Sequence, residues 1–447
     1  MGAPAPLDPA FPELERAAGG AGARAWVVGG YVRDRLLGRP VDEIDVVVED
    51  GGAPRLAALF AELTGSPQPV VFERFGTAQV VWKGRRIEFA SARAESYQPG
   101  SRKPEVKPAS IDDDLRRRDF TVNSLLMRFD GGVEDRLGSG LQDLAARLLR
   151  TPLDPLATFN DDPLRMLRGI RFAVELGFQL EPGLLPAMRA LAGRLRPPVL
   201  SVERVNEELR RMLLSGQPKR ALELLDEGGL LVEVLPELAA CRGVVQGGFH
   251  RWDVFGHTLE VVDRVPADVV TRLAALFHDV GKPSTAGPAG TFLGHERVGA
   301  EMAATALARL RFSNSEVEKV TRLVSLHLRP VYYESSWTDG AVRRLAREAG
   351  TDLERLMDLA RADIAASDYD QPGKLDELSA RLLEVLAEAP SRLRSVVGGD
   401  DIMRARGLPP GPEVGRLKNR LDELVMEGAV EPDRSAVLKY LDAHPEL

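Results

Sequence analysis

Residues 27–48 constrain the fold more than any other part of the chain. An apolar run ends in Gly29-Gly30, a helix-like segment follows, and Glu43 and Asp45 then stand two positions apart at the start of a valine-rich strand. A strand places residues i and i+2 on one face. Two neighbouring negative charges repel each other, and a hydrophobic core offers nothing to offset that repulsion. Bound divalent cations would offset it. A glycine pair before a helix offers backbone N–H groups to a polyphosphate. The stretch therefore predicts a site for Mg²⁺ and a nucleoside triphosphate.

Composition narrows the class of protein further. The chain has 447 residues, enough for several domains, and contains no run of 18 apolar residues that could cross a membrane. Its first residues lack the basic and apolar regions of a secretory signal. The single cysteine, Cys241, excludes an internal disulfide and a cysteine-based metal cluster. A formal net charge of −8 argues against nucleic-acid binding through overall charge. We expect a cytoplasmic protein.

Hydrophobic periodicity predicts an α+β protein, with an α/β head followed by a long helical body. Apolar runs predict strands at 25–28, 44–48, 79–82, 87–90 and 124–128. Apolar residues spaced as on one helix face predict helices at 164–176, 202–214, 219–227, 257–265, 269–277, 297–310, 315–327 and 375–387. The predicted domains are a head at 1–150, a helical neck at 151–235, a histidine-rich domain at 240–375 and a helical tail at 376–447.

Two further polar blocks follow the acidic strand. The first, residues 114–123, reads Asp-Leu-Arg-Arg-Arg-Asp-Phe-Thr-Val-Asn, and a charged surface turn would not predict the last four of these residues. The second, residues 161–172, begins Asp-Asp-Pro-Leu-Arg and continues as an amphipathic helix. On a helix, Asp162 and Arg165 would share a face. The segment also fits an N-capped helix with Asp161 or Asp162 as the cap.

These blocks, together with Gly29-Gly30-Tyr31-Val32-Arg33-Asp34 and Glu43-x-Asp45, resemble the motifs of class II tRNA nucleotidyltransferases, the CCA-adding enzymes. Bacterial poly(A) polymerases share the same head. The resemblance implies a polymerase-beta-like head that adds C and A from CTP and ATP to the 3′ end of tRNA. Glu43 and Asp45 would be the catalytic Mg²⁺ ligands, with Glu43 where the family more often has aspartate. The implied nucleotide-binding residues are Gly29, Gly30, Arg33, Arg118, Asp119, Asn123, Asp162, Arg165 and Arg168.

The chemistry of the bases explains how Asp162 and Arg165 could select C and A. Cytosine N4 and adenine N6 both donate hydrogen bonds, which Asp162 can accept, and Arg165 can donate to the neighbouring ring acceptors. Uracil and guanine would turn a carbonyl oxygen towards Asp162, and an unpaired buried acceptor costs about 1–3 kcal/mol. The protein itself could therefore act as the template.

Residues 93–106 resemble the flexible loop that family members need when they switch from C to A, and members that add only C tend to lack it. An ordinary basic surface loop is the alternative. Glu88, on the strand before this loop, is either a third acidic group beside the metals or a simple surface residue. The candidate loop residues are Arg93, Glu95, Tyr97 and Arg102.

Five of the six histidines fall between Gly248 and His327. The His278-Asp279 pair, after an apolar helix and His257, resembles the HD phosphohydrolase superfamily. The resemblance implies a metal site made by His257, His278, Asp279 and a later aspartate. Asp363 is the first choice for that aspartate, and Asp368 is its competitor.

Such nitrogen and carboxylate ligands suit Mn²⁺, Ni²⁺, Co²⁺ or Mg²⁺. His295 and His327 could bind a second ion or a substrate phosphate. Some bacterial CCA-adding enzymes carry a fused domain of this kind, with phosphodiesterase and phosphatase activities towards 2′,3′-cyclic and 2′-phosphates.

Three functions therefore stay open. The first is CCA addition together with a second, HD-type phosphoesterase activity. The second is the same chemistry with a narrower product, namely CC only, A only or poly(A), although residues 375–447 lack the strongly basic tail that bacterial poly(A) polymerases usually carry. The third is a phosphohydrolase with a nucleotide-sensing head, against which the intact Glu43 and Asp45 pair argues. The expected partner is tRNA, contacted at its 3′ end, acceptor stem and elbow; no membrane partner is expected, and the oligomeric state is open.

Overall fold

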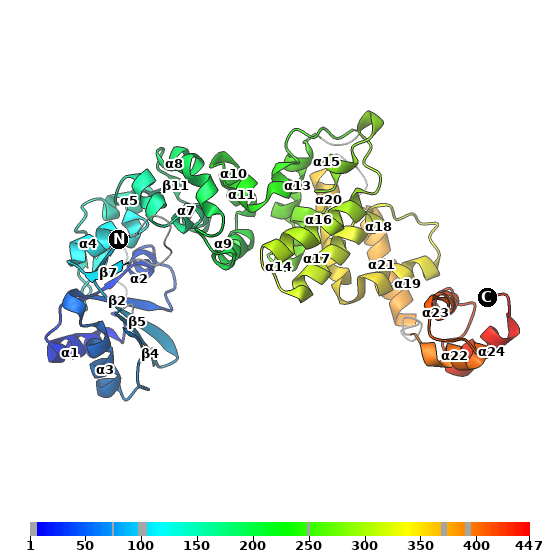
Figure 1. Cartoon of the computed structure of the whole chain (residues 1–447), viewed down its shortest axis with the longest axis horizontal. Coiled ribbons are helices and arrows are strands. Elements are labelled where there is room, and N and C mark those ends of the chain that lie inside the picture. The colour runs from blue at the N-terminus through cyan, green and yellow to red at the C-terminus, as the bar shows by residue number, and fades with distance from the viewer. Residues whose placement is uncertain (1–6, 74–75, 97–104, 248–250, 368–372, 389–394) are drawn as a thin grey trace. The chain divides into compact units, whose positions relative to one another are not determined.

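The computed structural model describes residues 7–73, 76–96, 105–247, 251–367, 373–388 and 395–447. The chain divides into two compact units with the boundary between Val234 and Leu235. Figure 1 shows that the first unit contains the sheet, from blue to green, and that the second unit, from green to red, is built of helices. Over the described residues, no helix combines the length and the apolarity needed to cross a bilayer.

The first unit starts with a mixed sheet and its covering helices and ends in helices. Its strands are β1 (Ala25–Val28), β2 (Ile44–Val48), β3 (Val70–Phe72), β4 (Thr77–Trp82), β5 (Arg85–Ser91), β6 (Arg93–Ser96), β7 (Glu105–Pro108), β8 (Leu126–Met127), β9 (Val133–Glu134), β10 (Leu148–Leu149) and β11 (Gln179–Leu180). Its helices are α1 (Phe11–Ala21), α2 (Gly30–Leu36), α3 (Ala53–Thr64), α4 (Ile111–Arg116), α5 (Gly140–Ala146), α6 (Pro155–Asp161), α7 (Leu164–Leu176), α8 (Leu184–Leu191), α9 (Val202–Leu214), α10 (Pro218–Glu227) and α11 (Leu231–Val234).

A seven-stranded sheet with the order β3-β4-β5-β2-β1-β8-β9 forms the head. Strand β2 is central, antiparallel to β1 and parallel to β5, so that Asp45 lies opposite Val28 on one side and Glu88 on the other. Directly paired residues point to the same face of a sheet. The side chains of Asp45 and Glu88 therefore project from one face, in the middle of the sheet.

Helices cover both faces of this sheet. On the face of Asp45, Trp26, Val28 and Val47 pack against Ile111 and Leu115 of α4. On the opposite face, α3 packs against β4 and β5, where the ring centroid of Phe60 lies 5.9 Å from that of Phe89. Burial on both sides explains why β1 and β2 are continuous apolar runs apart from the acidic residue. An interruption by aspartate in such a strand is a sign of function rather than of packing.

Within the described residues of the second unit, all regular elements are helices. Its helices are α12 (Pro236–Ala239), α13 (Val254–Arg264), α14 (Val269–Phe277), α15 (Lys282–Thr285), α16 (His295–Arg309), α17 (Asn314–Leu326), α18 (Leu328–Val331), α19 (Asp339–Ala349), α20 (Leu353–Ala366), α21 (Gly373–Glu388), α22 (Gly399–Arg406), α23 (Pro412–Met426) and α24 (Arg434–Ala443). Helices α13, α14 and α20 contact one another, and α16 packs along α17. The last three helices form a separate small core around Leu421 and Val437.

The predicted α+β class is confirmed, and several predicted elements coincide with observed ones. Strands β1 and β2 and helices α7, α9 and α14 have the predicted bounds. The predicted strand at 124–128 was too long, because only β8 pairs. The hydroxyl of Ser124 donates instead to the carbonyl oxygens of Leu115 and Phe120, after a 3₁₀ turn over Thr121–Asn123. Strands β3, β6, β7, β9, β10 and β11 were not predicted.

Candidate active sites

The acidic site of the head lies where β2 begins. Asp45 is on the strand, Glu43 lies just before it, and Glu88 is the direct partner of Asp45 on β5. Glu43 is 66% exposed and its carboxylate lies 3.3 Å from the Arg86 guanidinium. The negative charges of Glu88 and Glu43 both raise the pKa of Asp45. The alternative that Glu88 is a surface residue unrelated to this cluster is therefore less favoured, although Glu88 is exposed.

Burial dominates the electrostatics of Asp45. It raises the pKa of Asp45 to about 6, with further increases from Glu88 and Glu43, while the Arg118 guanidinium opposes the rise. Gly29 separates Asp45 from Arg118. A Cβ at Gly29 would lie 3.4 Å from Asp45 Oδ2 and 3.5 Å from Arg118 Nη1, and the φ of Gly29 is +80°. Glycine is thus favoured at this position by the backbone conformation, and a Cβ would only make van der Waals contact with the acid and the base.

The raised pKa of Asp45 predicts a pH dependence of stability in the metal-free protein. An unfolded aspartate titrates near 3.8 and folded Asp45 near 6, so the folded chain holds an extra proton between these values. The free energy of unfolding should then fall as pH rises through this window, by on the order of 1–3 kcal/mol. In Asp45→Asn this contribution should vanish. Thermal unfolding of metal-free wild type and variant from pH 4 to pH 7.5 would check this; parallel curves for the two proteins would contradict it.

Residues 114–123 bring arginine side chains towards the acidic strand. Asp114 is buried on α4 and accepts from both Arg117 and Arg118, with Arg118 Nη2 3.1 Å from Asp114 Oδ2. Burial would raise the pKa of Asp114, but Arg118 and Arg117 hold it below its usual value. Asp114 was not among the predicted site residues, and its contacts orient the two guanidinium groups.

Asp119 and Asn123 form a buried network with α2 and α7. Asp119 Oδ2 accepts from Arg168 Nη2 at 2.6 Å, and Asp119 Oδ1 accepts from Asn123 Nδ2 at 2.9 Å. Asn123 Oδ1 in turn accepts from Arg33 Nη1 at 2.7 Å. Burial alone would raise the pKa of Asp119, but Arg168 and Asn123 lower it to about 2. The structure thus brings together four of the predicted nucleotide-binding residues.

An aromatic ring lies among the arginines of this network. The guanidinium carbons of Arg33, Arg168 and Arg171 lie 4.9, 5.1 and 4.1 Å from the ring centroid of Phe172. Cations at such distances from an aromatic ring are attracted by its electrons. Phe172 therefore helps to hold three positive charges side by side, and nothing in its position in the sequence indicated this.

The predicted base-selecting pair is close to the same block but is arranged differently from the prediction. Asp162 is not on a helix: it follows α6 in an extended conformation, and its Oδ1 accepts from the backbone N–H of Leu164. Its Oδ2 accepts from Arg204 Nη2 at 3.0 Å. The predicted shared helix face was wrong, because Pro163 starts a new helix and leaves Asp162 as a capping residue.

Arg165 lies on the first turn of α7 and is buried. Its Nη2 donates to the backbone oxygen of Arg117 at 2.6 Å and its Nη1 to that of Thr158 at 3.3 Å. With Arg168 bound to Asp119, α7 is therefore held at two points on residues 114–123. Helix α7, whose Arg165 is proposed to contact the base, is joined by direct hydrogen bonds to residues 114–123, which are proposed to contact the triphosphate and ribose.

The candidate loop is entered through an antiparallel hairpin of β6 and β7. The backbone oxygen of Arg93 accepts from Arg117 Nε at 2.7 Å, which ties the start of the hairpin to the arginine block. Glu95 is on β6, and its side chain, like Tyr97 and Arg102, lies outside the described residues. The prediction for these three residues stays a prediction.

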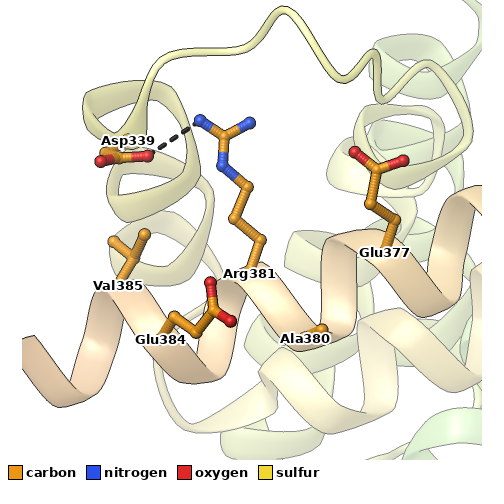
Figure 2. Close-up of a pocket in the computed structure, with 6 residues that line it drawn as sticks. All are labelled: Asp339, Glu377, Ala380, Arg381, Glu384 and Val385. Carbon is orange, nitrogen blue, oxygen red and sulfur yellow. Dashed lines mark hydrogen bonds and ion pairs between the residues drawn. The ribbon is translucent and has the colours of Figure 1, made fainter.

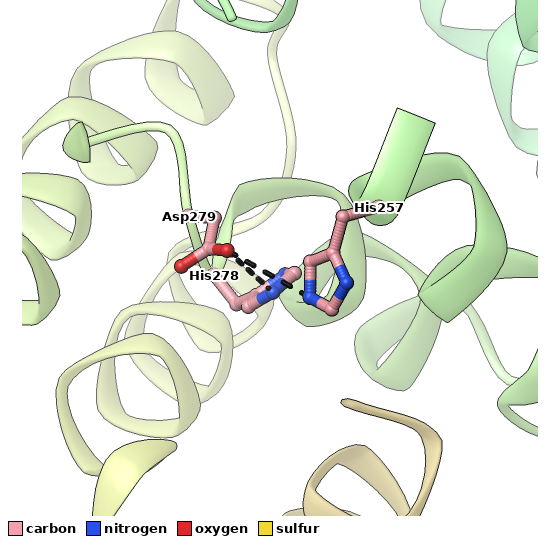
Figure 3. A group of neighbouring side chains, drawn as sticks. All are labelled: His257, His278 and Asp279. Carbon is pink, nitrogen blue, oxygen red and sulfur yellow. Dashed lines mark ion pairs between the residues drawn. The ribbon is translucent and has the colours of Figure 1, made fainter. Parts of the chain in front are cut away.

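The second unit contains a buried histidine cluster centred on Asp279. Asp279 Oδ2 lies 3.2 Å from His278 Nε2 and 3.8 Å from His257 Nε2, and Asp279 Oδ1 lies 3.2 Å from His295 Nε2 and 3.9 Å from His327 Nε2. One carboxylate thus faces two pairs of histidines (Figure 3 shows the first pair). The close spacing matches what two ions sharing a carboxylate would need.

The histidine rings are oriented for metal binding. His278, His295 and His327 each place Nδ1 2.7 Å from a backbone oxygen three residues earlier, so that Nε2 points into the cluster. With the proton on Nδ1, each Nε2 can serve as a metal ligand. The Nε2 atoms of His278 and His295 are buried and make no hydrogen bond among the described residues. Burial, together with His278, lowers the pKa of His327 to about 4 and keeps it neutral. These residues fit a divalent transition metal.

Asp363 completes the first half of the cluster. Its Oδ1 lies 2.9 Å from His257 Nε2, and although burial would raise its pKa, the bond to His257 holds the pKa below its usual range. Asp368 and His250 lie outside the described residues. Residues that the sequence did not single out are Lys282, which contacts Asp279, and Gln246, which contacts Lys282. Lys282 follows Asp279 by three residues, and this helical spacing was the available signal.

A glycine sets the distance between the two halves of the cluster. A Cβ on Gly281 would lie 2.3 Å from the backbone oxygen of His295 and 2.7 Å from the backbone nitrogen of Gly299. Both neighbours are backbone atoms on α16 and have no room to give way. Gly281 therefore allows the helix that carries His295 to approach Asp279.

Gly281→Ala is expected to push His295 away from Asp279. We expect the bound metal to fall from two ions to one per chain, and the second unit to lose about 1–3 kcal/mol of stability through overpacking. Metal content by atomic absorption and thermal unfolding would measure both. Gly373→Ala is the matched control, since nothing lies within 4 Å of a Cβ there. Unchanged metal content in Gly281→Ala would show that the contact does not position His295.

A shallow pocket of about 320 Å³ lies on α19 and α21 (Figure 2). Its charged residues are Asp339, Glu377, Arg381 and Glu384, and Arg381 already donates to Asp339 at 2.8 Å. None of its lining residues belongs to the acidic site or to the histidine cluster. We assign no function to it.

Three family models match the chain. They are the Poly A polymerase head domain over residues 25–150, the "Probable RNA and SrmB- binding site of polymerase A" over 177–242, and the HD domain over 249–367. The acidic strand lies in the first match and the histidine cluster in the third. Head and cluster together define a nucleotidyltransferase that carries an HD domain.

The chain belongs to the family of tRNA nucleotidyltransferases that includes the CCA-adding enzymes. It is 35% identical to the A-adding tRNA nucleotidyltransferase of Deinococcus radiodurans, over 92% of this chain and 94% of that protein. It is 37% identical to the CC-adding tRNA nucleotidyltransferase of Thermus thermophilus, over 91% and 90%. It is also similar to the crystal structure of the Bacillus stearothermophilus CCA-adding enzyme in complex with CTP, with a TM-score of 0.67, 25% identity and 98% of each chain covered. The predicted resemblance is confirmed.

Proposed function

We propose that this chain completes the 3′ end of tRNA by adding C, C and A from CTP and ATP. The observation that carries the proposal is that Asp45, Glu43 and Glu88 lie close to Arg118, with Gly29 between Asp45 and Arg118. Helix α7 lies beside them and is hydrogen-bonded to residues 114–123. This arrangement provides carboxylates for cations and a guanidinium for a triphosphate at one place. Relatives that add A, that add CC and that are named multifunctional CCA proteins support it.

In this proposal Asp45 and Glu43 hold Mg²⁺, and Glu88 adds negative charge beside them. Bound Mg²⁺ would lower the pKa of the attacking 3′-hydroxyl and neutralise the leaving pyrophosphate. Arg118, held by Asp114, faces the triphosphate through its planar fork, and the backbone of Gly29 and Gly30 leaves room for it. With a pKa of about 6, Asp45 is mainly deprotonated above pH 6 and is then available to a cation.

The remaining predicted residues shape the nucleotide site. Arg33 is buried and bound to Asp34 and Asn123, so we propose that it acts by holding Asn123 rather than by contacting phosphate. Asp119 keeps lone pairs that can accept from ribose hydroxyls. Arg168 holds Asp119 in its charged form, and this keeps the acceptor available at physiological pH.

Base selection rests on Asp162 and Arg165. Arg204 occupies one oxygen of Asp162, and the Leu164 N–H occupies the other. Each carboxylate oxygen has a second lone pair, so Asp162 can still accept from an exocyclic amine of C or A. These two contacts fix the direction in which that lone pair points. Asp162 therefore needs no rearrangement to reject a carbonyl oxygen.

The HD domain is proposed to be a metal-dependent phosphohydrolase. His257, His278, Asp279 and Asp363 would hold one ion such as Ni²⁺ or Mn²⁺, or Mg²⁺, and Asp279 with His295 and His327 would hold a second. Bound ions would polarise a phosphoryl oxygen and supply a hydroxide nucleophile. The 2′,3′-cyclic and 2′-phosphates expected from the sequence are the proposed substrates. We further propose a head at 1–150, a neck at 151–235, an HD domain at 240–375 and a tail at 376–447.

Addition of only A or only CC is the second candidate function, since both kinds of relative match over nine-tenths of the chain. The partner would be tRNA in either case, contacted at its 3′ end, acceptor stem and elbow. A tRNA 3′ end, CTP and ATP are all available in the cytoplasm, which is the proposed compartment.

Product length decides between these functions. Purified chain is incubated with tRNA that ends at the discriminator base, at C or at CC, with each labelled triphosphate alone and in combination. CCA addition predicts two additions from CTP and a single further addition from ATP. Extension of only the tRNA ending in CC by ATP would establish the A-adding function, and arrest after two C additions would establish the CC-adding function. A long A tract would establish poly(A) polymerase.

A further inference from the structure

Lys282 and Gln246 form a buried pair beside the histidine cluster. Lys282 starts α15, and its Nζ lies 2.6 Å from Asp279 Oδ2 and 2.5 Å from Gln246 Oε1. Lys282 is 8% exposed and Gln246 is 7% exposed. Gln246 belongs to the segment between α12 and α13 and is therefore distant in sequence from Lys282. It nevertheless contacts the Lys282 ammonium group, which in turn contacts the Asp279 carboxylate.

The amide nitrogen of Gln246 has no acceptor. Its Nε2 is buried and makes no hydrogen bond within the part of the chain that the structure describes. Buried polar groups in folded proteins nearly always have a partner, and each exception calls for an explanation. Here an ammonium with a further N–H and an amide with two N–H groups lie side by side in a buried place. Such a set of donors is suited to an anion.

Metal binding would change the surroundings of Lys282. Asp279 Oδ2 is also the oxygen that faces His257 and His278, so a cation bound there would lie close to the Lys282 ammonium. Like charges at short range repel strongly in a buried site. Gln246 Oε1 is the other acceptor that Lys282 already uses, and it would keep the ammonium nearby after Lys282 leaves Asp279.

We propose that Gln246 is a positioning residue that holds the Lys282 ammonium beside the loaded metal cluster. There, the ammonium binds a non-bridging phosphoryl oxygen of the phosphate ester, and Gln246 acts by holding the ammonium in place. Lys282 thereby changes from the counter-ion of Asp279 into a ligand of the substrate. This inference rests on the proposed phosphohydrolase function of the HD domain.

Four full-length variants test the inference, namely Gln246→Met, Lys282→Met, the double variant, and Ser284→Ala as the control. Ser284 lies on the same short helix, and its hydroxyl donates to the backbone oxygen of Gly281 rather than into the cluster. Calorimetry measures Mn²⁺ binding first, and then the binding of inorganic phosphate to the Mn²⁺-loaded protein. Thermal unfolding verifies that the second unit, which carries all the substitutions, is folded in each variant.

We expect Gln246→Met to leave Mn²⁺ affinity unchanged and to weaken phosphate binding about ten-fold, the size expected for losing a hydrogen bond to a charged group. In the Lys282→Met background the same change should have a much smaller effect, because Gln246 acts largely through Lys282. Ser284→Ala should bind phosphate like the wild type.

Two results would overturn the inference while leaving the phosphohydrolase proposal intact. One is unchanged phosphate affinity in Mn²⁺-loaded Gln246→Met, and the other is an equal loss with and without Lys282. Weakened Mn²⁺ binding in Gln246→Met would show that Gln246 supports the metal ligands instead. A wild-type protein that binds no Mn²⁺ would refute the proposed function of the HD domain itself.

Discussion

Asp45→Asn is expected to slow nucleotide addition by on the order of a thousand-fold or more, the scale on which loss of a group that stabilises developing charge acts. Among the three carboxylates of the acidic cluster, Asp45 is the least exposed. It pairs directly with Glu88 on β5, and the Arg118 guanidinium lowers its pKa. An asparagine of the same size keeps the shape of the strand but removes the charge that would hold a cation. Single-turnover addition of labelled CTP and ATP to tRNA would measure the effect, with metal binding by the HD domain recorded in parallel.

Asp42→Asn is the matched control for this experiment. Asp42 is exposed and lies three residues before Asp45. The Asp42→Asn variant is expected to add nucleotides at the wild-type rate. If Asp45→Asn retained more than a tenth of wild-type activity at saturating Mg²⁺, the assignment of Asp45 as a metal ligand would be wrong. The HD domain should bind Mn²⁺ equally well in all three proteins, because its ligands belong to the other compact unit.

Asp279→Asn is expected to remove both metal ions from the HD domain and to abolish hydrolysis of a 2′,3′-cyclic nucleotide. Both oxygens of Asp279 face histidines, Oδ2 towards His257 and His278 and Oδ1 towards His295 and His327. Asparagine offers one neutral oxygen in place of a shared carboxylate, so the half with His295 and His327 loses the carboxylate that faces it, and the half with His257 and His278 keeps only Asp363. Metal content per chain and release of the nucleotide monophosphate would measure the loss.

Nucleotide addition should persist in Asp279→Asn, because the head belongs to the other compact unit, and thermal unfolding tests whether the second unit has folded. Asp376→Asn is a suitable control, since Asp376 is exposed on α21 in the same unit. Retention of two ions per chain by Asp279→Asn would contradict the arrangement proposed for the cluster. Loss of nucleotide addition together with hydrolysis would show that the two sites are not independent.

The elements that sequence predicted well are those whose burial is uniform. Strands β1 and β2 are buried on both faces, and their apolar runs end where the glycine pair or the acidic residue begins. Helix α14 is apolar over nearly its whole length and was placed correctly for the same reason. In these segments the local hydrophobic pattern agrees with the burial found in the folded protein, so the pattern alone predicts the element correctly.

The parts that sequence did not reveal depend on partners far away in the chain. The contacts of Arg165 with the backbone oxygens of Arg117 and Thr158 were not predicted. Asp162 was placed on a helix because Pro163 was counted inside one. The contact between Gln246 and Lys282 joins residues 36 positions apart. Spacing rules describe neighbours on one element, and they contain no information about which distant backbone oxygen or side chain will be met.

Gly281 shows that the residue on which a reactive centre depends can itself carry no reactive group. Because α16 approaches to within contact of its backbone, the separation of His295 from Asp279 is fixed by a missing methyl group. A survey of acids, bases and nucleophiles would omit this position. An engineer who wished to silence one half of the cluster, while leaving every ligand in place, would begin there.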